Sequence, residues 1–440
     1  MRGERLELKI WIPTLYFAKG IPHVVVFVIT LLLLHQMHLS PAETLCCVSL
    51  CYLPWVLKVW WKPYINSTMD YRRWILLTQL LLMFTFALLA FVLSTQWLTV
   101  CLLFFMAWLA AIHNVATDGL THTSPSSLAP HTSHLAPRVC LLPSSSIFEE
   151  LPRKFALVVG QGVLLVLAGN IQVFYRHDML YAWRVLFYIL SGIFMLLFFW
   201  HVFSLPSSRR NASSVLPRTS YLAPRTSYLV PRTSYLAPCT SYLAPCTSYL
   251  APRTSCISFL LFYPFAQGMV AKVSILFLVD TFRNGGVGLS PQEFGFVMGI
   301  IGIAALTAGG FLGMKALSRY GFSHCLRPMA LSMLIPCAVY VALSYWQPQS
   351  LMTVGLCVLV EQFAYGFGFA AYLSYLKQIE HREQGKSLMA LSLMMGCIIS
   401  GPLLQSLGYN GFFILTQALS LLTLLSTIIL KRKCQNALRV

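Results

Sequence analysis

Long apolar runs are the feature that most constrains what this chain can fold into. A helix needs about 20 predominantly apolar residues to cross a bilayer core, and the 440 residues contain about twelve such runs. Only 10% of the residues are charged, whereas a soluble domain carries about 25%. The composition therefore excludes an ordinary soluble enzyme, and its high hydrophobicity excludes a disordered chain. The predicted spans are 13–35, 43–62, 74–94, 97–117, 155–175, 183–204, 257–280, 291–316, 325–346, 350–376, 386–407 and 411–430.

The positions of the basic residues give the predicted orientation. The net charge is +18, from 31 Lys and Arg against 13 Asp and Glu. Basic residues gather at the N-terminus, in the connections after every second span, in the central linker and in the tail, while the opposite connections hold only Arg176, Arg184 and Arg283. Because basic loops stay on the cytoplasmic side, both termini are predicted to be cytoplasmic. The charge then reports orientation in a lipid bilayer, and we expect no nucleic-acid partner.

The spans divide the chain into two groups of six. The predicted parts are an N-terminal half at 1–204 with a repeat insertion at 121–146, a heptapeptide-repeat linker at 205–256, a C-terminal half at 257–430 and a cytoplasmic tail at 431–440. The linker repeats the unit T-S-Y-L-A-P-R. A proline in each unit excludes a coiled coil, because proline removes a backbone donor and clashes in a helix interior. The linker is therefore predicted to be an extended low-complexity segment on the cytoplasmic side.

Polar residues within spans are costly and are functional candidates for that reason. Those in the fourth, seventh and tenth spans are His113, Asn114, Asp118, Gln267, Lys272, Glu361, Gln362 and Tyr365. Asp118 has two open interpretations, a proton carrier or substrate contact, and a local partner at the end of its helix. Lys272 lies near the middle of its span, where a lysine needs a partner or a water-filled cavity. We predict that it faces a cavity.

Several motifs of other function classes are missing from the sequence. There is no GxxxxGK[ST] phosphate loop, no GxSxG nucleophile motif, no HExxH pair and no CxxC pair. Without a phosphate loop, an ATP-driven pump in one chain is not indicated. We expect no enzyme activity, no cofactor and no metal site.

Five segments carry a resemblance to a known family. They are LPWVLKVWWKPYINSTMDYRRW, AWLAAIHNVATDGL, VVGQGVLLVLAG, FYPFAQGMVAKVSILFLVD and VEQFAYGFGFAAYLSYL. These segments resemble spans of the AmpG branch of muropeptide permeases, which is related to acetyl-CoA transporters and belongs to the major facilitator superfamily. The resemblance implies an all-α membrane protein with the major facilitator fold, about 12 transmembrane helices in two six-helix halves. It adds Gln161, in the fifth span, to the substrate-cavity candidates.

The same resemblance implies a function. It is proton-coupled import of anhydro-muropeptides across the bacterial cytoplasmic (inner) membrane by a monomer, for peptidoglycan recycling and with a link to β-lactamase induction. Asp118 would be the proton-coupling residue, and the small-molecule substrate would bind between the halves. Asp70, Arg72 and Arg73 match the loop after the second span, which would act as a conformational switch.

Departures from the family pattern keep alternatives open. Asn114 and Gln267 stand where AmpG-type relatives usually carry acids, and neither side chain can titrate. One alternative is a major facilitator transporter of another substrate, such as acetyl-CoA or a peptide or sugar conjugate. Another is a degenerate permease or membrane sensor that does not transport, which the repeat insertion favours.

Overall fold

The computed structural model describes residues 2–123, 144–175, 178–206, 253–379 and 382–437. Most of the predicted insertion at 121–146 and of the linker at 205–256 lies outside these residues, as does the end of the tail. The described part of the chain contains helices and connections and no strand, which confirms the predicted all-α class.

The N-terminal half consists of six predicted spans, several of which are divided into shorter helical segments. Its elements are α1 (Arg2–Val24), η1 (Val25–Ile29), α2 (Thr30–Gln36), α3 (Pro41–Leu50), α4 (Leu53–Val56), α5 (Lys58–Thr68), α6 (Tyr71–Val92), α7 (Gln96–Thr123), α8 (Ser144–Leu157), η3 (Val158–Val163), α9 (Leu164–Phe174) and α10 (Met179–Ser204). The segments η1 and η3 are π-helical turns within otherwise continuous spans.

The C-terminal half repeats this organisation. Its elements are α11 (Arg253–Phe262), α12 (Phe265–Val279), η5 (Phe282–Asn284), α13 (Pro291–Phe294), η6 (Gly295–Gly302), α14 (Ile303–Tyr320), α15 (Phe322–Ser332), α16 (Ile335–Trp346), α17 (Leu351–Gln378) and α18 (Arg382–Ala437). The eighth span contains the third long π-helical segment, η6.

Helix lengths agree with the predicted span count. Ten helical stretches of the described residues are long and apolar enough to cross a membrane, and the pair Pro41–Val56 and Lys58–Thr68, bent by 52°, makes an eleventh. One of the ten, Glu383–Leu430, has 48 residues, which is about 70 Å of helix against a bilayer core of about 30 Å. It is broken at Gly408, so it supplies two spans and brings the total to twelve.

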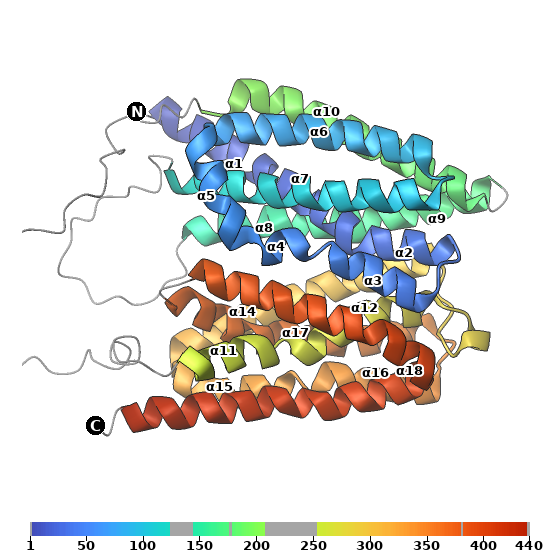
Figure 1. Cartoon of the computed structure of the whole chain (residues 1–440), viewed down its shortest axis with the longest axis vertical. Coiled ribbons are helices and arrows are strands. Elements are labelled where there is room, and N and C mark those ends of the chain that lie inside the picture. Colours follow the sequence, from blue (N-terminus) through green and yellow to red (C-terminus); the bar gives the residue numbers. More distant parts are fainter. Residues whose placement is uncertain (1, 124–143, 176–177, 207–252, 380–381, 438–440) are drawn as a thin grey trace, which may run out of the picture.

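Gly408 is where the chain reverses direction between the last two spans. Its backbone has φ 64° and ψ −179°, a conformation open essentially only to glycine. Figure 1 shows the two parts of α18 running in opposite directions on either side of this turn. The break falls between the predicted spans 386–407 and 411–430 and confirms that division.

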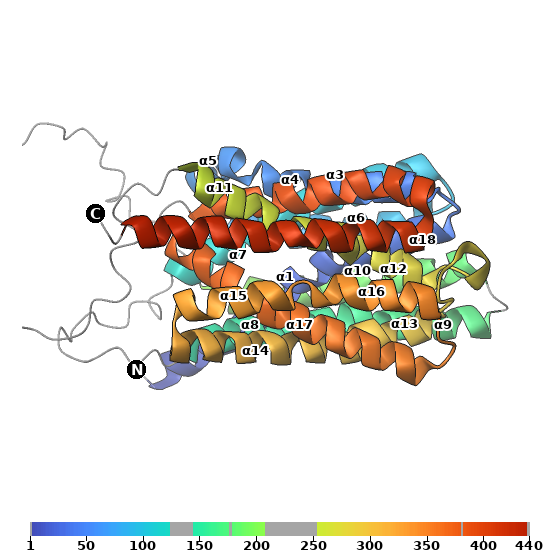
Figure 2. The same cartoon turned by 90° about the horizontal axis from the view of Figure 1, so that it is seen from below.

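The two halves pack against each other along the length of the bundle. They lie one above the other in Figure 1, the first half in blue and green and the second in yellow to red, and the described ends of the chain lie at the same end of the molecule (Figures 1 and 2). This end is called the terminal end below. Gly162 of η3 and Gly299 of η6 form one close contact between the halves, since a Cβ on Gly299 would collide with the Gly162 backbone.

The outer surface is strongly apolar. Large apolar side chains are at least 75% exposed at Phe91, Trp97, Phe203 and Met352. Exposed apolar patches of this extent fit contact with lipid rather than with water.

The fifth span is continuous, because α8, η3 and α9 form one helical run up to Phe174. The protein is a multi-pass membrane protein.

Candidate functional site

A cavity lies between the two halves near the middle of the bundle. Its volume is about 160 Å³. The polar lining comes from Gln161 of η3, Lys272 of α12 and Gln362 of α17, so three of the predicted candidates come together from both halves. The remaining lining residues are Val28, Leu157, Ala271, Ile275, Met298, Ile303 and Leu306. A largely apolar cavity with a few converging polar groups is the usual form of a small-molecule site.

The three long π-helical segments meet around this cavity. η3 contacts both η1 and η6, and each segment supplies one lining residue, Val28, Gln161 and Met298. A π-helical turn widens the backbone by one residue and is frequent at functional sites, because it re-aims side chains and frees backbone carbonyls for other donors. The glycines of η3 and η6 let the two backbones come this close.

Lys272 joins the two halves across the cavity. Its Nζ donates a hydrogen bond of 2.9 Å to the carbonyl oxygen of Phe27 in η1 and lies 5.1 Å from the centroid of the Phe27 ring. Among the described residues no carboxylate lies within ion-pair distance of Lys272. The side chain is buried, so its charge is stabilised by one carbonyl and one aromatic face.

Asp118 forms an ion pair with Lys19. The Lys19 Nζ of α1 lies 2.5 Å from Asp118 Oδ1 of α7, and the charges of Lys58 and Lys386 also act on Asp118. A carboxylate that is paired with a lysine can take up a proton and become neutral when the lysine moves away. The pairing could not be predicted from local spacing, because 99 residues separate the partners; the lysine within the first span was the one available signal.

A cluster of lysines around Glu383 joins the halves at the terminal end. Lys58 and Lys62 lie on α5 of the first half, whereas Glu383 and Lys386 lie at the start of α18 in the second half. Their Nζ atoms lie 3.1, 3.4 and 3.1 Å, respectively, from Glu383 carboxylate oxygens. The Ser387 hydroxyl also bonds the Trp55 carbonyl across this contact at 3.4 Å. The sequence prediction did not include Glu383.

The remaining candidates of the first half lie outside the cavity in this conformation. His113 of α7 is buried, and a hydrogen bond of 3.0 Å joins its Nδ1 to the Thr78 hydroxyl of α6. Its Nε2 has no hydrogen-bond partner among the described residues. Asn114 is half-buried on the same helix. His113 packs within the half and neither residue lines the cavity, so a part in substrate binding requires another conformation.

The remaining candidates of the second half also pack within that half. Gln267 donates to the Met333 carbonyl at 2.8 Å. The Glu361 Oε2 and the Tyr340 hydroxyl are buried without a hydrogen bond of good geometry to any described residue, and they lie close enough to interact electrostatically. Tyr365 packs its ring on Phe369, with centroids 5.3 Å apart. Glu361 and Tyr365 do not line the cavity, whereas their neighbour Gln362 does.

The predicted switch loop lies at the start of α6. Asp70 precedes the first turn of this helix, and the Arg72 guanidinium donates to the Val202 carbonyl of α10 at 2.6 Å. Arg73 is exposed. Arg72 therefore ties the third span to the sixth within the first half, and the conformational role of the loop stays a prediction.

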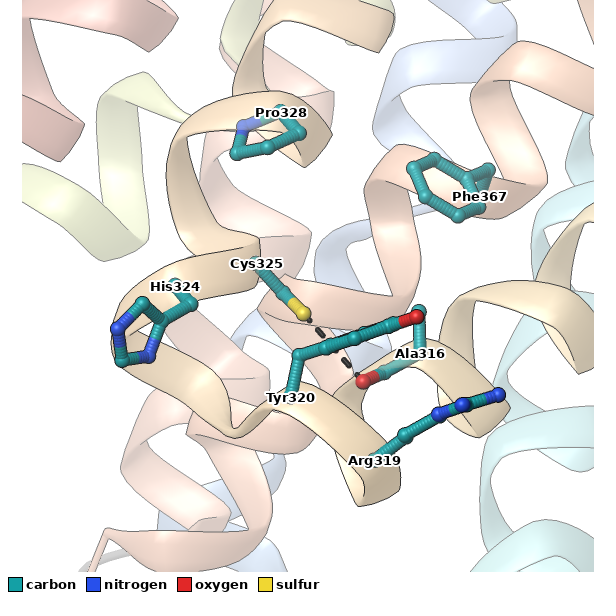
Figure 3. A pocket seen from close by; sticks show the side chains of 7 residues that line it. All are labelled: Ala316, Arg319, Tyr320, His324, Cys325, Pro328 and Phe367. Carbon is teal, nitrogen blue, oxygen red and sulfur yellow. Dashed lines mark hydrogen bonds between the residues drawn. The ribbon is translucent and has the colours of Figure 1, made fainter.

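A larger recess of about 630 Å³ lies away from the contact between the halves. Figure 3 shows its lining side chains, which come from α14, α15 and α17 of the second half alone. The Cys325 thiol interacts with the Ala316 carbonyl at 3.4 Å, and the Arg319 guanidinium lies 5.5 Å from the Tyr320 ring centroid. Because one half supplies every lining residue, rocking of the halves would not open this recess alternately to the two sides. The described residues hold no group of three or more His, Cys, Asp and Glu that could bind a metal.

Relatives by sequence cover part of the chain. No family model matches it. The protein named "Putative transporter AmpG 4" of Rickettsia conorii is 23% identical over 169 residues, which are 37% of this chain and 39% of that protein. Its namesake in Rickettsia felis is 23% identical over 181 residues, 40% of this chain and 42% of that protein. The chain thus matches about two fifths of the length of these curated relatives.

Solved structures match nearly the whole chain. The nucleoside transporter NupG superposes with a TM-score of 0.62 at 13% identity, over 96% of this chain and 99% of that one. The D-xylose-proton symporter gives 0.62 at 11% identity, over 96% and 97%. The protein has the major facilitator fold. A bacterial homologue of the human lysosomal transporter Spinster, inward-facing and unoccupied, gives 0.61 at 14% identity over 99% and 98%. Within this fold, the sequence likeness of the chain is to AmpG-like transporters.

Proposed function

We propose that this protein is a secondary transporter whose halves rock around the cavity at Lys272. The observation that carries the proposal is the mid-bundle cavity itself, lined by polar side chains of both halves and holding a buried lysine without a carboxylate partner. In transporters built from two repeats, the substrate binds at the interface between them near the bilayer midplane. A substrate with an anionic group would supply the counter-charge that Lys272 lacks.

The proposed substrate class is the anhydro-muropeptides, imported for peptidoglycan recycling. Such molecules carry carboxylates for Lys272 and amide and hydroxyl groups for Gln161 and Gln362, and the likeness to AmpG-named transporters points the same way. A cavity of about 160 Å³ is smaller than a typical ligand pocket of about 300–1,000 Å³. The halves must therefore separate before a molecule of this size enters.

Proton coupling is proposed at Asp118. In the ion pair with Lys19 the carboxylate is held as an anion. If Asp118 takes up a proton, Lys19 loses its partner, and the pair then favours a different arrangement of α1 and α7. Proton uptake by Asp118 would therefore change the conformation of the first half, which also supplies the Phe27 carbonyl that Lys272 bonds.

The proposed setting is the bacterial cytoplasmic membrane, with a monomer whose two termini are cytoplasmic. The shared end of the described termini fits an even number of spans, and the basic connections at that end fit the positive-inside rule. A link to β-lactamase induction follows only if muropeptides are the substrate.

Uptake into inverted and right-side-out vesicles tests this proposal. Labelled anhydro-muropeptide should accumulate in right-side-out vesicles bearing a proton gradient, and both a protonophore and Asp118→Asn should abolish the accumulation. Uptake that persists with both would contradict proton coupling at Asp118. A panel that includes acetyl-CoA and neutral sugar conjugates distinguishes another substrate from no transport at all.

A further inference from the structure

The contact at the terminal end of the two halves contains more positive than negative charge. One carboxylate, that of Glu383, is surrounded by the ammonium groups of Lys58, Lys62 and Lys386 at 3.1 to 3.4 Å. This group is called the lysine cluster. Its ion pairs leave two positive charges in excess. Like charges held this close repel, so an added anion would be stabilised there.

The lysine cluster places three ammonium groups around one carboxylate, which accepts a hydrogen bond from Lys386 and lies at ion-pair distance from Lys58 and Lys62. The Lys58 side chain is only 8% exposed, whereas those of Lys62 and Lys386 are about one third exposed. The Lys58 side of the cluster is therefore buried, whereas the side formed by Lys62 and Lys386 is accessible to solutes. Glu383 itself supplies the carboxylate, and ammonium groups bind carboxylate and phosphate oxygens by the same charge-assisted hydrogen bonds.

We propose that Lys58, Lys62 and Lys386 form a binding site for a carboxylate or phosphate group of a solute, which Glu383 occupies in this conformation. An incoming anion takes the place of the Glu383 carboxylate. Since Glu383 then loses its ion pairs with Lys58 and Lys62 of α5, the anion also weakens the contact that closes the halves at this end. The binding site rests on the proposed function only in one respect, that the solute is the transported molecule.

The lysine cluster is electrostatically continuous with the cavity. Lys58 and Lys386 act on Asp118, and Lys58 acts on Lys19. Lys19 and Lys272 in turn both act on His23 of α1. Positive groups thus recur from the lysine cluster through Lys19 to Lys272, with the Asp118 carboxylate paired to Lys19 among them. The solute class that follows for the lysine cluster is one with carboxylate or phosphate groups.

Binding of a small dianion to the purified full chain tests the site without requiring transport. The probes are succinate and its uncharged amide, succinamide, in detergent without added lipid and at constant ionic strength, and the thermal unfolding midpoint is measured. Succinate should raise the midpoint saturably, and succinamide should not. Equal effects of the two probes, or none of succinate, would overturn the proposal.

Three variants separate this site from unspecific charge effects. Glu383→Gln should lower the half-effect concentration of succinate about threefold to tenfold, because the competing carboxylate is gone. Lys62→Gln, chosen because its side chain is partly exposed and its loss is tolerable for folding, should raise it by a similar factor. Lys377→Gln, which removes the same charge at an exposed position of α17, should leave it unchanged. Identical values for all three variants would contradict the site.

A lipid headgroup is the other source of the same chemistry. In nanodiscs, a half-effect concentration of succinate that is equal in phosphatidylcholine and in phosphatidylglycerol supports a solute site. A rise in phosphatidylglycerol that Lys62→Gln removes would assign the site to lipid and overturn the solute assignment. Binding of succinate by a protein that fails to take up any muropeptide would leave this inference standing and reject the proposed function.

Discussion

Lys19 of the first half and Lys272 of the second half, two lysines that lie within membrane spans, differ in what balances their charge. Lys19 pairs with the Asp118 carboxylate, whereas the hydrogen bond of Lys272 within the described residues goes to the Phe27 carbonyl across the cavity. A buried charge without a counter-charge is costly, and no carboxylate of the described residues offsets this cost at Lys272. Under the proposed function, Lys19 stabilises the conformation of its half, whereas Lys272 binds the substrate.

The largest effect expected from changing either lysine is on transport, from Lys272→Met. Methionine keeps most of the side-chain volume and removes the charge, so uptake should fall more than about tenfold, the loss of one charge-assisted contact. The unfolding midpoint should stay the same or rise, because replacing a buried charge with an apolar group of similar volume is often stabilising. Uptake into vesicles and thermal unfolding in detergent measure the two effects.

Lys272→Arg is the matched control, since it keeps the charge with a different shape and should retain part of the uptake. A variant Lys272→Met that unfolds easily yet transports at the rate of the parent protein would reverse the comparison.

The next effect is on stability, from Asp118→Asn. This substitution leaves the Lys19 ammonium without its carboxylate, and breaking a partly buried pair in this way should cost about 1–3 kcal/mol, less than for a fully buried pair. Adding Lys19→Met should recover most of the loss, because the stranded charge is then removed as well. Unfolding midpoints of the single and double variants, measured at one pH in detergent, give the coupling between the two residues. Additive losses would mean that the ion pair is not what Asp118 contributes to folding.

The smallest effect is expected from Lys58→Gln. Lys62 and Lys386 still balance Glu383 after this change. Although Lys58 itself is buried, Glu383 is about one third exposed, and an ion pair with an exposed partner contributes less than about 1 kcal/mol. Its unfolding midpoint should therefore lie close to that of the parent protein and above that of Asp118→Asn. A larger loss than that of Asp118→Asn would show that the lysine cluster is a structural element first.

The spans were predictable because they depend on composition along the chain. A run of about 20 apolar residues can only cross the membrane or be buried, and the division at Gly408 follows from the same runs. The placement of Gln161, Lys272 and Gln362 at one cavity was also predicted in part, through polar residues within spans and the family resemblance.

Contacts between distant segments were not predictable from the same patterns. The pairing of Lys19 with Asp118, and of Lys58 with Glu383, joins residues far apart in the sequence. The rotation of the tenth span about its own axis decides which of its polar residues faces the cavity. Gln362 lines the cavity, whereas the Glu361 side chain is buried within the second half. The π-helical segments also depend on packing of one backbone against another, as at Gly162 and Gly299, for which no local signal exists.

Equilibrium binding of labelled anhydro-muropeptide to the purified protein tests the central claim most directly. The account predicts saturable binding by the parent protein and by Lys377→Met, and loss of binding in Lys272→Met although that variant remains folded. Equal binding by Lys272→Met and the parent protein would contradict the assignment of the substrate site to the cavity between the halves.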